Sequence, residues 1–252
     1  MKTMLVSACL TVLLAACAGG GYDGTRQGRA DDMAAIQTRL ALAYVQAGDL
    51  RQAVAAIDGA VRADRKNEAA WLVRGQIFRL IDNRQEAERS LKQVLRLNPA
   101  SAEGNNNYGW FLCSAENRPA ESLAYFARAL ADRTYPEPYV AHLNAGICAG
   151  KVGEYARAQE HFAAALAVMS DFSPALKASA ENHYLAGDYA AAQSRYGAFR
   201  SVAAKPSADD ILLGWRIARA AGDDSAAADY AGELAAAYPY AAELNRISRK
   251  TH

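Results

Sequence analysis

The sequence predicts an all-α protein built as a solenoid of repeated helical hairpins. Small residues between larger ones recur at spacings of 34, 34, 37, 34 and 34 residues. These small residues are Ala41, Gly75, Gly109, Gly146, Ala180 and Gly214. About twelve residues beyond most of them, a second pattern has four-then-three spacing, as in Ala53, Ile57 and Ala60. Because this spacing places side chains on one face of an α-helix, each period contains two helices.

The composition and the residues expected at helix ends favour the same fold class. Hydrophobic residues make up 52% of the chain, and the large share of alanine among them favours closely packed helices. Residues 48–53, 153–158 and 187–192 each begin with a glycine followed by an acidic residue, which suits the end of one helix and the start of the next. All seven prolines fall at inferred turns or in first helical turns.

The period and the small crossing residues resemble the tetratricopeptide repeat (TPR). The resemblance implies six repeats and a short tail at 241–252; the repeats lie at 34–67, 68–101, 102–138, 139–172, 173–206 and 207–240. Repeat 2 fits the family pattern best, and repeat 3 departs from it because 133–138 adds residues. In repeat 6 the crossing residue is either Ala226 or Ala227.

The N-terminus has the features of a secretion signal. Lys2 precedes a short apolar run that is too short to span a bilayer, and "LAAC" follows at 14–17. This ending resembles a bacterial lipobox. The resemblance implies that 1–16 is removed, that Cys17 carries an N-acyl diacylglycerol, and that 17–33 is a flexible tether. Ala18, in place of aspartate, implies transfer to the outer membrane. The alternative is an ordinary signal peptide with a chance cysteine.

Two further cysteines lie on the first helices of neighbouring repeats. If the mature chain is periplasmic, Cys113 and Cys148 are in an oxidising compartment. Adjacent helices pack with axes about 8–10 Å apart, a separation at which facing cysteines can approach bonding distance. We therefore expect a disulfide, with two separate buried thiols as the alternative.

No arrangement of residues indicates catalysis. The sequence has no nucleophile elbow, zinc-protease motif, paired-cysteine motif or phosphate-binding glycine loop. Its four histidines are dispersed, and none lies at ligand spacing to a cysteine. The formal net charge is +1, without a basic stripe that would suit nucleic acid. We expect no enzyme activity, metal, cofactor other than the covalent lipid, nucleic acid or small-molecule substrate.

The repeat instead implies a binding surface. In TPR proteins positions 2, 5, 9 and 12 of each repeat usually face a concave groove. Carried over, this rule implies a partner groove that includes Leu42, Leu72, Gln76, Asn106, Trp110, Leu143, Ile147 and Trp215. Trp110 and Trp215 are the expected anchors, whereas Trp71 occupies a packing position. The alternative for any one position is that a neighbouring helix or the tail covers it.

Several segments contain residues that the general TPR pattern does not require. They are "NNNYGWFLC" at 105–113, "TYP" at 134–136, "LNAGIC" at 143–148, "ADDILLGWRIARAAGD" at 208–223 and "YPY" at 238–240. Together with the lipobox and the six repeats, they resemble the type IV pilus biogenesis and stability lipoproteins called PilW or PilF.

This resemblance implies a non-enzymatic assembly factor on the periplasmic face of the outer membrane. Such a protein helps the secretin PilQ to reach the outer membrane and form its pore, as a pilotin, or stabilises the pilus fibre. The groove near the first repeats, with Leu42 and Leu72, is the implied partner site. The alternatives are a general outer-membrane TPR adaptor in envelope or β-barrel assembly, and a periplasmic enzyme with an unrecognised site. The sequence leaves the oligomeric state open.

Overall fold

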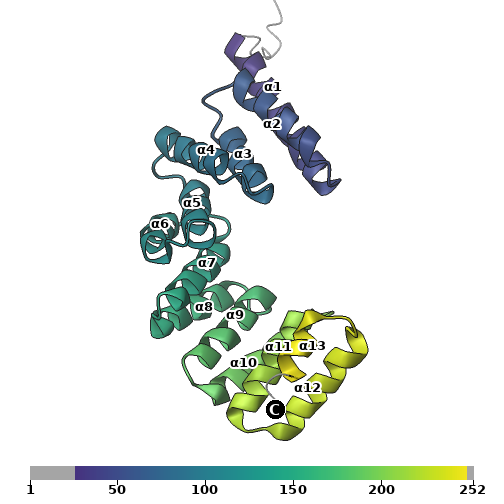
Figure 1. Cartoon of the computed structure of the whole chain (residues 1–252). Helices are drawn as coiled ribbons and strands as arrows, with labels where there is room; N and C mark the ends of the chain where they lie inside the picture. The colour runs from purple at the N-terminus through teal and green to yellow at the C-terminus, as the bar shows by residue number, and fades with distance from the viewer. Residues whose placement is uncertain (1–25, 249–252) are drawn as a thin grey trace, which may run out of the picture.

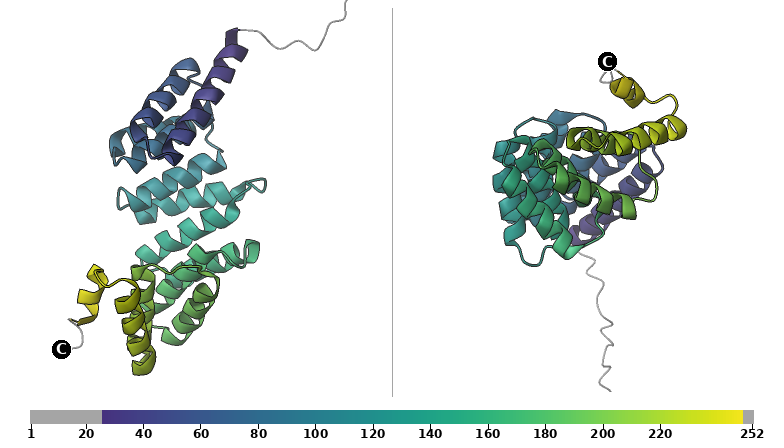
Figure 2. Two further views of the ribbon diagram at one scale, coloured as in Figure 1. Left: turned by 90° about the vertical axis from the view of Figure 1, so that its right-hand side faces the viewer. Right: turned by 90° about the horizontal axis from the view of Figure 1, so that it is seen from below.

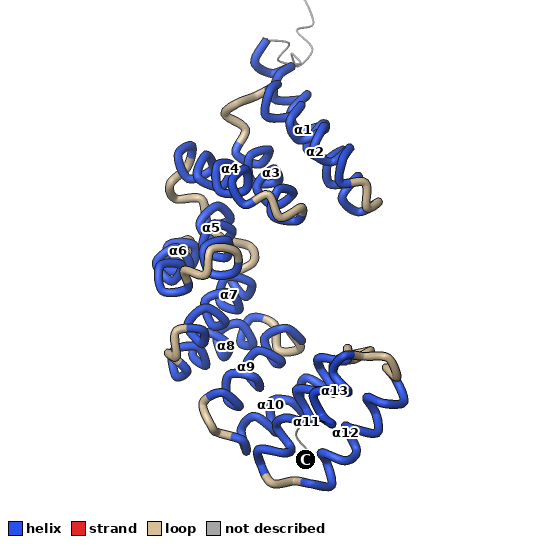
Figure 3. Tube along the Cα trace, in the orientation of Figure 1, coloured by secondary structure: helices blue, strands red, loops and turns tan. Residues whose placement is uncertain are grey.

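The computed structural model describes residues 26–248, which form thirteen α-helices and no strand (Figures 1 and 3). The helices are α1 Arg26–Gln46, α2 Leu50–Ala63, α3 Glu68–Leu80, α4 Arg84–Leu97, α5 Ala102–Ser114, α6 Pro119–Ala131, α7 Pro138–Lys151, α8 Tyr155–Val168, α9 Ser173–Leu185, α10 Tyr189–Val202, α11 Ala208–Ala221, α12 Asp224–Ala237 and α13 Ala242–Ser248. This arrangement confirms the all-α solenoid. None of the described helices is long and apolar enough to cross a membrane.

The helices form two layers in a stack of hairpins. Consecutive helices pair as α1 with α2 and so on to α11 with α12, and the pairs follow one another from one end of the molecule to the other (Figures 1 and 2). Each first helix contacts the first helix of the next pair. The backbones of the second helices lie farther apart among the described residues, although side chains of α10 and α12 meet through the Tyr196–Tyr230 ring contact and the Arg200–Glu233 ion pair. The odd-numbered helices α1 to α11 therefore form one continuous layer, and α2 to α12 form the other.

The turn inside each hairpin requires a left-handed residue. Glycines 48, 153, 187 and 222 occupy this position with φ between 76° and 80°, whereas Asp82 and Asn117 occupy it in repeats 2 and 3 with φ of 55° and 52°. Asp49 and Asp188 then cap the second helices by accepting backbone N–H bonds of 3.1 Å. Glu154 makes no side-chain cap; its carboxylate accepts a hydrogen bond from Arg157 instead.

Glycine at the crossing position allows two helices to approach closely. A Cβ atom built on Gly75 would lie 2.8 Å from Leu91, and one on Gly146 would lie 2.5 Å from the Phe162 ring. These contacts explain the 34-residue recurrence of small residues, because a larger side chain would separate the paired helices. In repeat 6, Ala227 is the buried residue of the predicted pair Ala226 and Ala227.

Both ends of the solenoid are longer than the sequence indicated. The helix α1 begins at Arg26, so residues 26–33 are helical, although we expected them in the tether. The expected tail contains α13, which packs against α11 and α12. Both extensions lie outside the predicted repeats at 34–240, so the spacing of small residues did not indicate them. The predicted signal peptide and Cys17 lie outside the described residues.

Candidate partner groove and disulfide

The first helices leave an apolar pocket between repeats 1 and 2. It is an open pocket of about 210 Å³, and α1 and α3 line it. Its lining residues are Leu42, Val45, Val73, Gln76, Ile77, Arg79 and Leu80. Leu42 is 40% exposed, so it can be reached by a partner, and Gln76 supplies a polar group at the edge. The predicted groove residues Leu42 and Gln76 therefore lie in one pocket.

A second apolar pocket occupies the same place between repeats 4 and 5. Its volume is about 170 Å³, and it lies between α7 and α9 with Phe162 of α8 among its lining residues. Gly146 and Gly150 of α7 line the pocket, and the Phe162 ring and the Asn182 side chain lie directly against these two glycines. Ile147 and Leu185 supply apolar walls. Each pocket can accept one apolar side chain or a short apolar segment.

Side-chain amides lie between these two pockets. Gln76 of α3 donates a hydrogen bond of 3.1 Å to Asn107 of α5, and Asn144 of α7 donates one of 3.0 Å to Asn106. Asn106 in turn donates to the hydroxyl of Tyr135 at 3.3 Å. Burial raises the pKa of Tyr135 to about 12, so its hydroxyl stays protonated at neutral pH. The bond between Gln76 and Asn107 joins α3 to α5, and the bond between Asn144 and Asn106 joins α7 to α5.

A disulfide joins the first helices of repeats 3 and 4. The Sγ atoms of Cys113 and Cys148 lie 2.10 Å apart, and their Cα atoms are separated by 6.0 Å. Both residues are fully buried. Trp110, Leu143 and Ile147 pack against the same cluster and are only partly exposed. The disulfide and this cluster occupy the α5–α7 junction, which has the same place in the repeat as the two pockets.

Comparison with known proteins places this geometry in a family. A sequence model of the tetratricopeptide repeat matches residues 34–67 and 68–101, the limits predicted for repeats 1 and 2. The crystal structure of PilW, described as a widely conserved type IV pilus biogenesis factor, is 46% identical. It superimposes with a TM-score of 0.83 over 85% of this chain and 97% of PilW. The chain belongs to the PilW/PilF family.

A more distant member agrees in length as well as in fold. The type IV pilus assembly protein PilF of Pseudomonas aeruginosa is 27% identical over 251 residues, which are 97% of this chain and 98% of PilF. A solved structure of PilF from Pseudomonas aeruginosa is 25% identical, with a TM-score of 0.76 over 88% of this chain and 99% of that chain. This chain is therefore a TPR protein of type IV pilus biogenesis.

Within this PilW/PilF-family fold, two predicted groove residues are not available to a partner. Asn106 is 5% exposed because the amide network encloses it. Trp215 was an expected anchor, but it is 4% exposed. It belongs to an apolar cluster that includes Ile247 and Leu244 of α13. The helix α13 packs on α11, so the sequence rule for groove positions is wrong for Trp215.

The remaining predicted residues have intermediate exposure. Leu72 packs at the edge of the cluster that contains Phe78 and Leu91. Trp110 also remains partly exposed, so it can still contact a partner. Trp71, which we placed in the core, is half-buried and donates a hydrogen bond of 2.9 Å to the carbonyl oxygen of Arg65.

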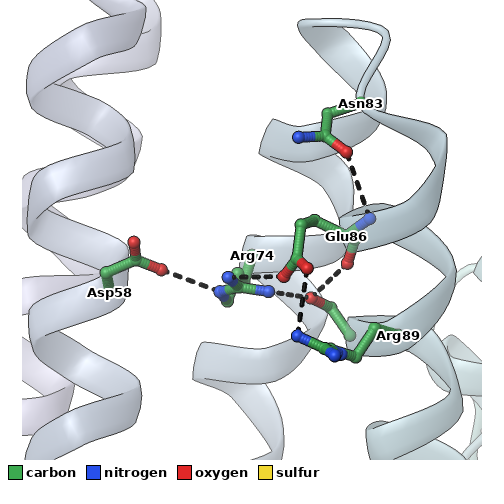
Figure 4. A network of polar contacts seen from close by, with 6 residues as sticks. Asp58, Arg74, Asn83, Glu86 and Arg89 are labelled. Atoms are coloured by element: carbon green, nitrogen blue, oxygen red, sulfur yellow. Dashed lines mark hydrogen bonds and ion pairs between the residues drawn. The ribbon is translucent and has the colours of Figure 1, made fainter.

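An arginine network that the sequence analysis missed fixes the first pocket of this PilW/PilF-family chain (Figure 4). Arg74 of α3 donates to Asp58 of α2 at 2.8 Å and to Glu86 of α4 at 2.9 Å. It also donates to the hydroxyl of Ser90 at 2.7 Å, and its guanidinium lies 4.4 Å from the centre of the Phe78 ring. The network holds α3 against α2 and α4. The network could not be predicted from the sequence, because its four members belong to three helices and share no sequence motif.

Two histidines of repeat 4 form a pair outside the groove residues. The Nδ1 atoms of His142 and His161 lie 3.1 Å apart. Burial lowers the pKa of both, and the proximity of His142 lowers that of His161 further. The pair is consistent with one neutral imidazole donating to the other. Among the described residues no group of three or more metal-ligating side chains occurs.

Proposed function

We propose that this chain is an outer-membrane lipoprotein that binds a pilus-machinery protein in its groove and promotes assembly of the PilQ secretin. The pocket between α1 and α3 is the observation that carries this proposal. It is open and apolar, and the Arg74 network holds one of its walls in place. The printed names of the relatives, a type IV pilus biogenesis factor and a type IV pilus assembly protein, support the pilus role.

Binding in this groove would depend on a few apolar side chains. A partner segment would place one apolar side chain beside Leu42 and Leu80, and another in the pocket beside Ile147 and Leu185. Gln76 lines the first pocket and donates to Asn107, so its amide oxygen is the atom that can accept a hydrogen bond from the backbone of an extended segment. Such a groove binds and orients a partner, and the proposed role is therefore non-enzymatic.

The lipid on Cys17 would act by raising the local concentration. A lipid chain with a second membrane signal keeps a protein at the bilayer. A short flexible connection then gives an effective concentration on the order of millimolar for encounters at the same surface. A secretin subunit bound by the groove would thus be held at the outer membrane, where its pore forms.

Deletion of the gene tests the proposed function. We expect that an immunoblot for heat- and detergent-resistant PilQ multimers will show their loss, and that piliation will fall. Normal multimers together with normal piliation would refute the pilus role. A general loss of outer-membrane β-barrels, with PilQ affected no more than the others, would support the general envelope adaptor instead.

Point variants test which surface acts. Leu42→Asp places a charge in the pocket between α1 and α3 and is expected to reduce the multimers. The matched control is Val168→Asp, because Val168 is an exposed apolar residue on α8 and lies outside both groove pockets. Equal loss in both variants would exclude the α1–α3 pocket as the partner site. Cys17→Ser should remove the protein from the outer-membrane fraction.

A further inference from the structure

The first helix carries an apolar stripe on the side that faces away from the protein. Met33, Ile36 and Leu40 are 49%, 51% and 39% exposed. They lie three and four positions apart and so share one face of α1. The buried residues of α1, such as Ala34 and Ala41, lie about 120° around the helix axis from this stripe. The stripe therefore does not contribute to the core.

No described part of the chain covers the stripe. The helix α1 packs against α2 and α3, which contact its other side. Figure 1 shows α1 and α2 at one end of the stack, with α11 to α13 at the opposite end. A TPR solenoid usually ends in a helix with a polar outer surface, because an apolar outer face reduces solubility. An apolar stripe at this end consequently requires an occupant.

The position of α1 along the chain indicates which occupant it is. Eight residues, 18–25, separate Cys17 from the start of α1. Eight residues span at most about 29 Å when fully extended. If Cys17 is inserted in a bilayer, α1 is the element of the fold nearest to the lipid. Arg29 lies on the same face, and its charge suits the phosphate groups at a membrane surface.

A second copy of the chain is a less suitable occupant. A stable protein interface buries about 800 Å² on each partner. Three half-exposed side chains on one helix provide only a fraction of that area. A membrane surface needs no such area, because the anchor already holds the helix beside it.

We propose that α1 lies on the phospholipid surface, with Met33, Ile36 and Leu40 inserted among the headgroups. This inference rests on the proposed lipid anchor at Cys17. Docking by α1 would make the solenoid stand on the membrane by its first repeat, with α13 farthest from the lipid. The pocket between α1 and α3 would then lie close to the bilayer, and the pocket between α7 and α9 would lie farther into the periplasm.

Met33 is a natural reporter for this contact. The chain has four methionines, and only Met33 and Met169 follow the predicted signal peptide. In the experiment, the mature chain beginning at Cys17 is coupled through that thiol to a maleimide phospholipid. The carrier is a vesicle of phosphatidylethanolamine with phosphatidylglycerol. Chloramine T, which stays in the water, then oxidises exposed methionine, and mass spectrometry gives the rate at each site.

We expect Met33 to oxidise about tenfold more slowly on vesicles than in the same chain blocked with a lipid-free maleimide. This is the protection given by a population that is nine-tenths docked. Met169, at the turn after α8, should oxidise at the same rate in both samples. The variant Ile36→Ser with Leu40→Ser should restore the rate at Met33. The control variant Val168→Ser with Val202→Ser should leave Met33 protected, because both residues are exposed, belong to α8 and α10 and lie outside both groove pockets.

Two outcomes would overturn the inference. In the first, Met33 oxidises equally on vesicles and in solution. In the second, Met33 is protected without vesicles and the chain has the mass of a dimer, so that a second copy covers the stripe. Coupling through maleimide anchors the chain whether or not cells attach lipid. The mass of the protein purified from cell membranes reports the natural lipid on Cys17 separately.

Discussion

Replacing Gly146 with alanine tests the packing that defines the repeat. Gly146 is the crossing residue of α7, and an added Cβ would lie 2.5, 2.8 and 2.9 Å from three atoms of the Phe162 ring. Phe162 is 1% exposed and belongs to the buried cluster around the disulfide, so its ring has little room to move. The methyl group must therefore displace α7 from α8.

The expected magnitude follows from two opposing effects. Alanine in place of a helical glycine is favourable by about 1 kcal/mol, because it restricts the unfolded chain. Overpacking a close-packed core costs about 1–3 kcal/mol, and three contacts below 3.0 Å place Gly146→Ala at the upper end. We therefore expect a net loss of about 2 kcal/mol in the free energy of unfolding.

Gly197→Ala is the matched control. Gly197 lies inside α10, and a Cβ atom there meets nothing within 4 Å. Only the favourable helix effect remains, so this variant should gain about 1 kcal/mol. Urea unfolding followed by circular dichroism should give a lower midpoint for Gly146→Ala than for the parent and a higher one for Gly197→Ala. The reasoning is refuted if Gly146→Ala is as stable as Gly197→Ala.

Three further predictions concern the disulfide, a turn and the histidine pair. The disulfide closes a loop with a sequence separation of 35, so Cys113→Ser with Cys148→Ser should cost about 4 kcal/mol of unfolding free energy by the chain-entropy relation. Two free thiols in unreduced protein, detected by alkylation and mass spectrometry, would contradict the bond. Asn117 has a φ of 52°, so Asn117→Gly should raise the free energy of unfolding in urea by about 1 kcal/mol, whereas Gly153→Asn at the equivalent turn should lower it. The pKa values of His142 and His161 are lowered from 6.5 in the folded chain, so the unfolded chain binds more protons, and stability should be full above about pH 6.5 and fall as the pH drops further. Removing the pair by His142→Asn with His161→Gln should reduce that loss, and an unchanged pH dependence would contradict the assignment.

The helical hairpins could be predicted from the sequence because their period has a local physical cause. A residue at each helix crossing must be small whatever the rest of the protein does, as Gly75 and Gly146 illustrate. The turn glycines, such as Gly48, mark the helix ends for an equally local reason, their positive φ. Such constraints act within one repeat and recur in the next, so a single sequence is sufficient to show them.

The accessibility of the groove could not be predicted in the same way. Trp215 occupies a groove position, yet α13 covers it because a terminal helix can fold back on the last repeat. Asn106 is enclosed through contacts with Tyr135 and Asn144, which are 29 and 38 residues away. Burial of these side chains depends on long-range packing, and a position rule for an average repeat does not contain that information.

The difference between the contacts within the two layers affects how the solenoid can bend. Because the backbones of α2, α4, α6, α8 and α10 do not approach one another as closely as those of the first helices, a change in the curvature of the stack disturbs fewer contacts in that layer. Bending is opposed in the other layer, where each first helix packs on the next. It is opposed most at the junction of α5 and α7, where a covalent bond joins the two helices. A partner that spans the α1–α3 and α7–α9 pockets would therefore cross the stiff α5–α7 junction that lies between them.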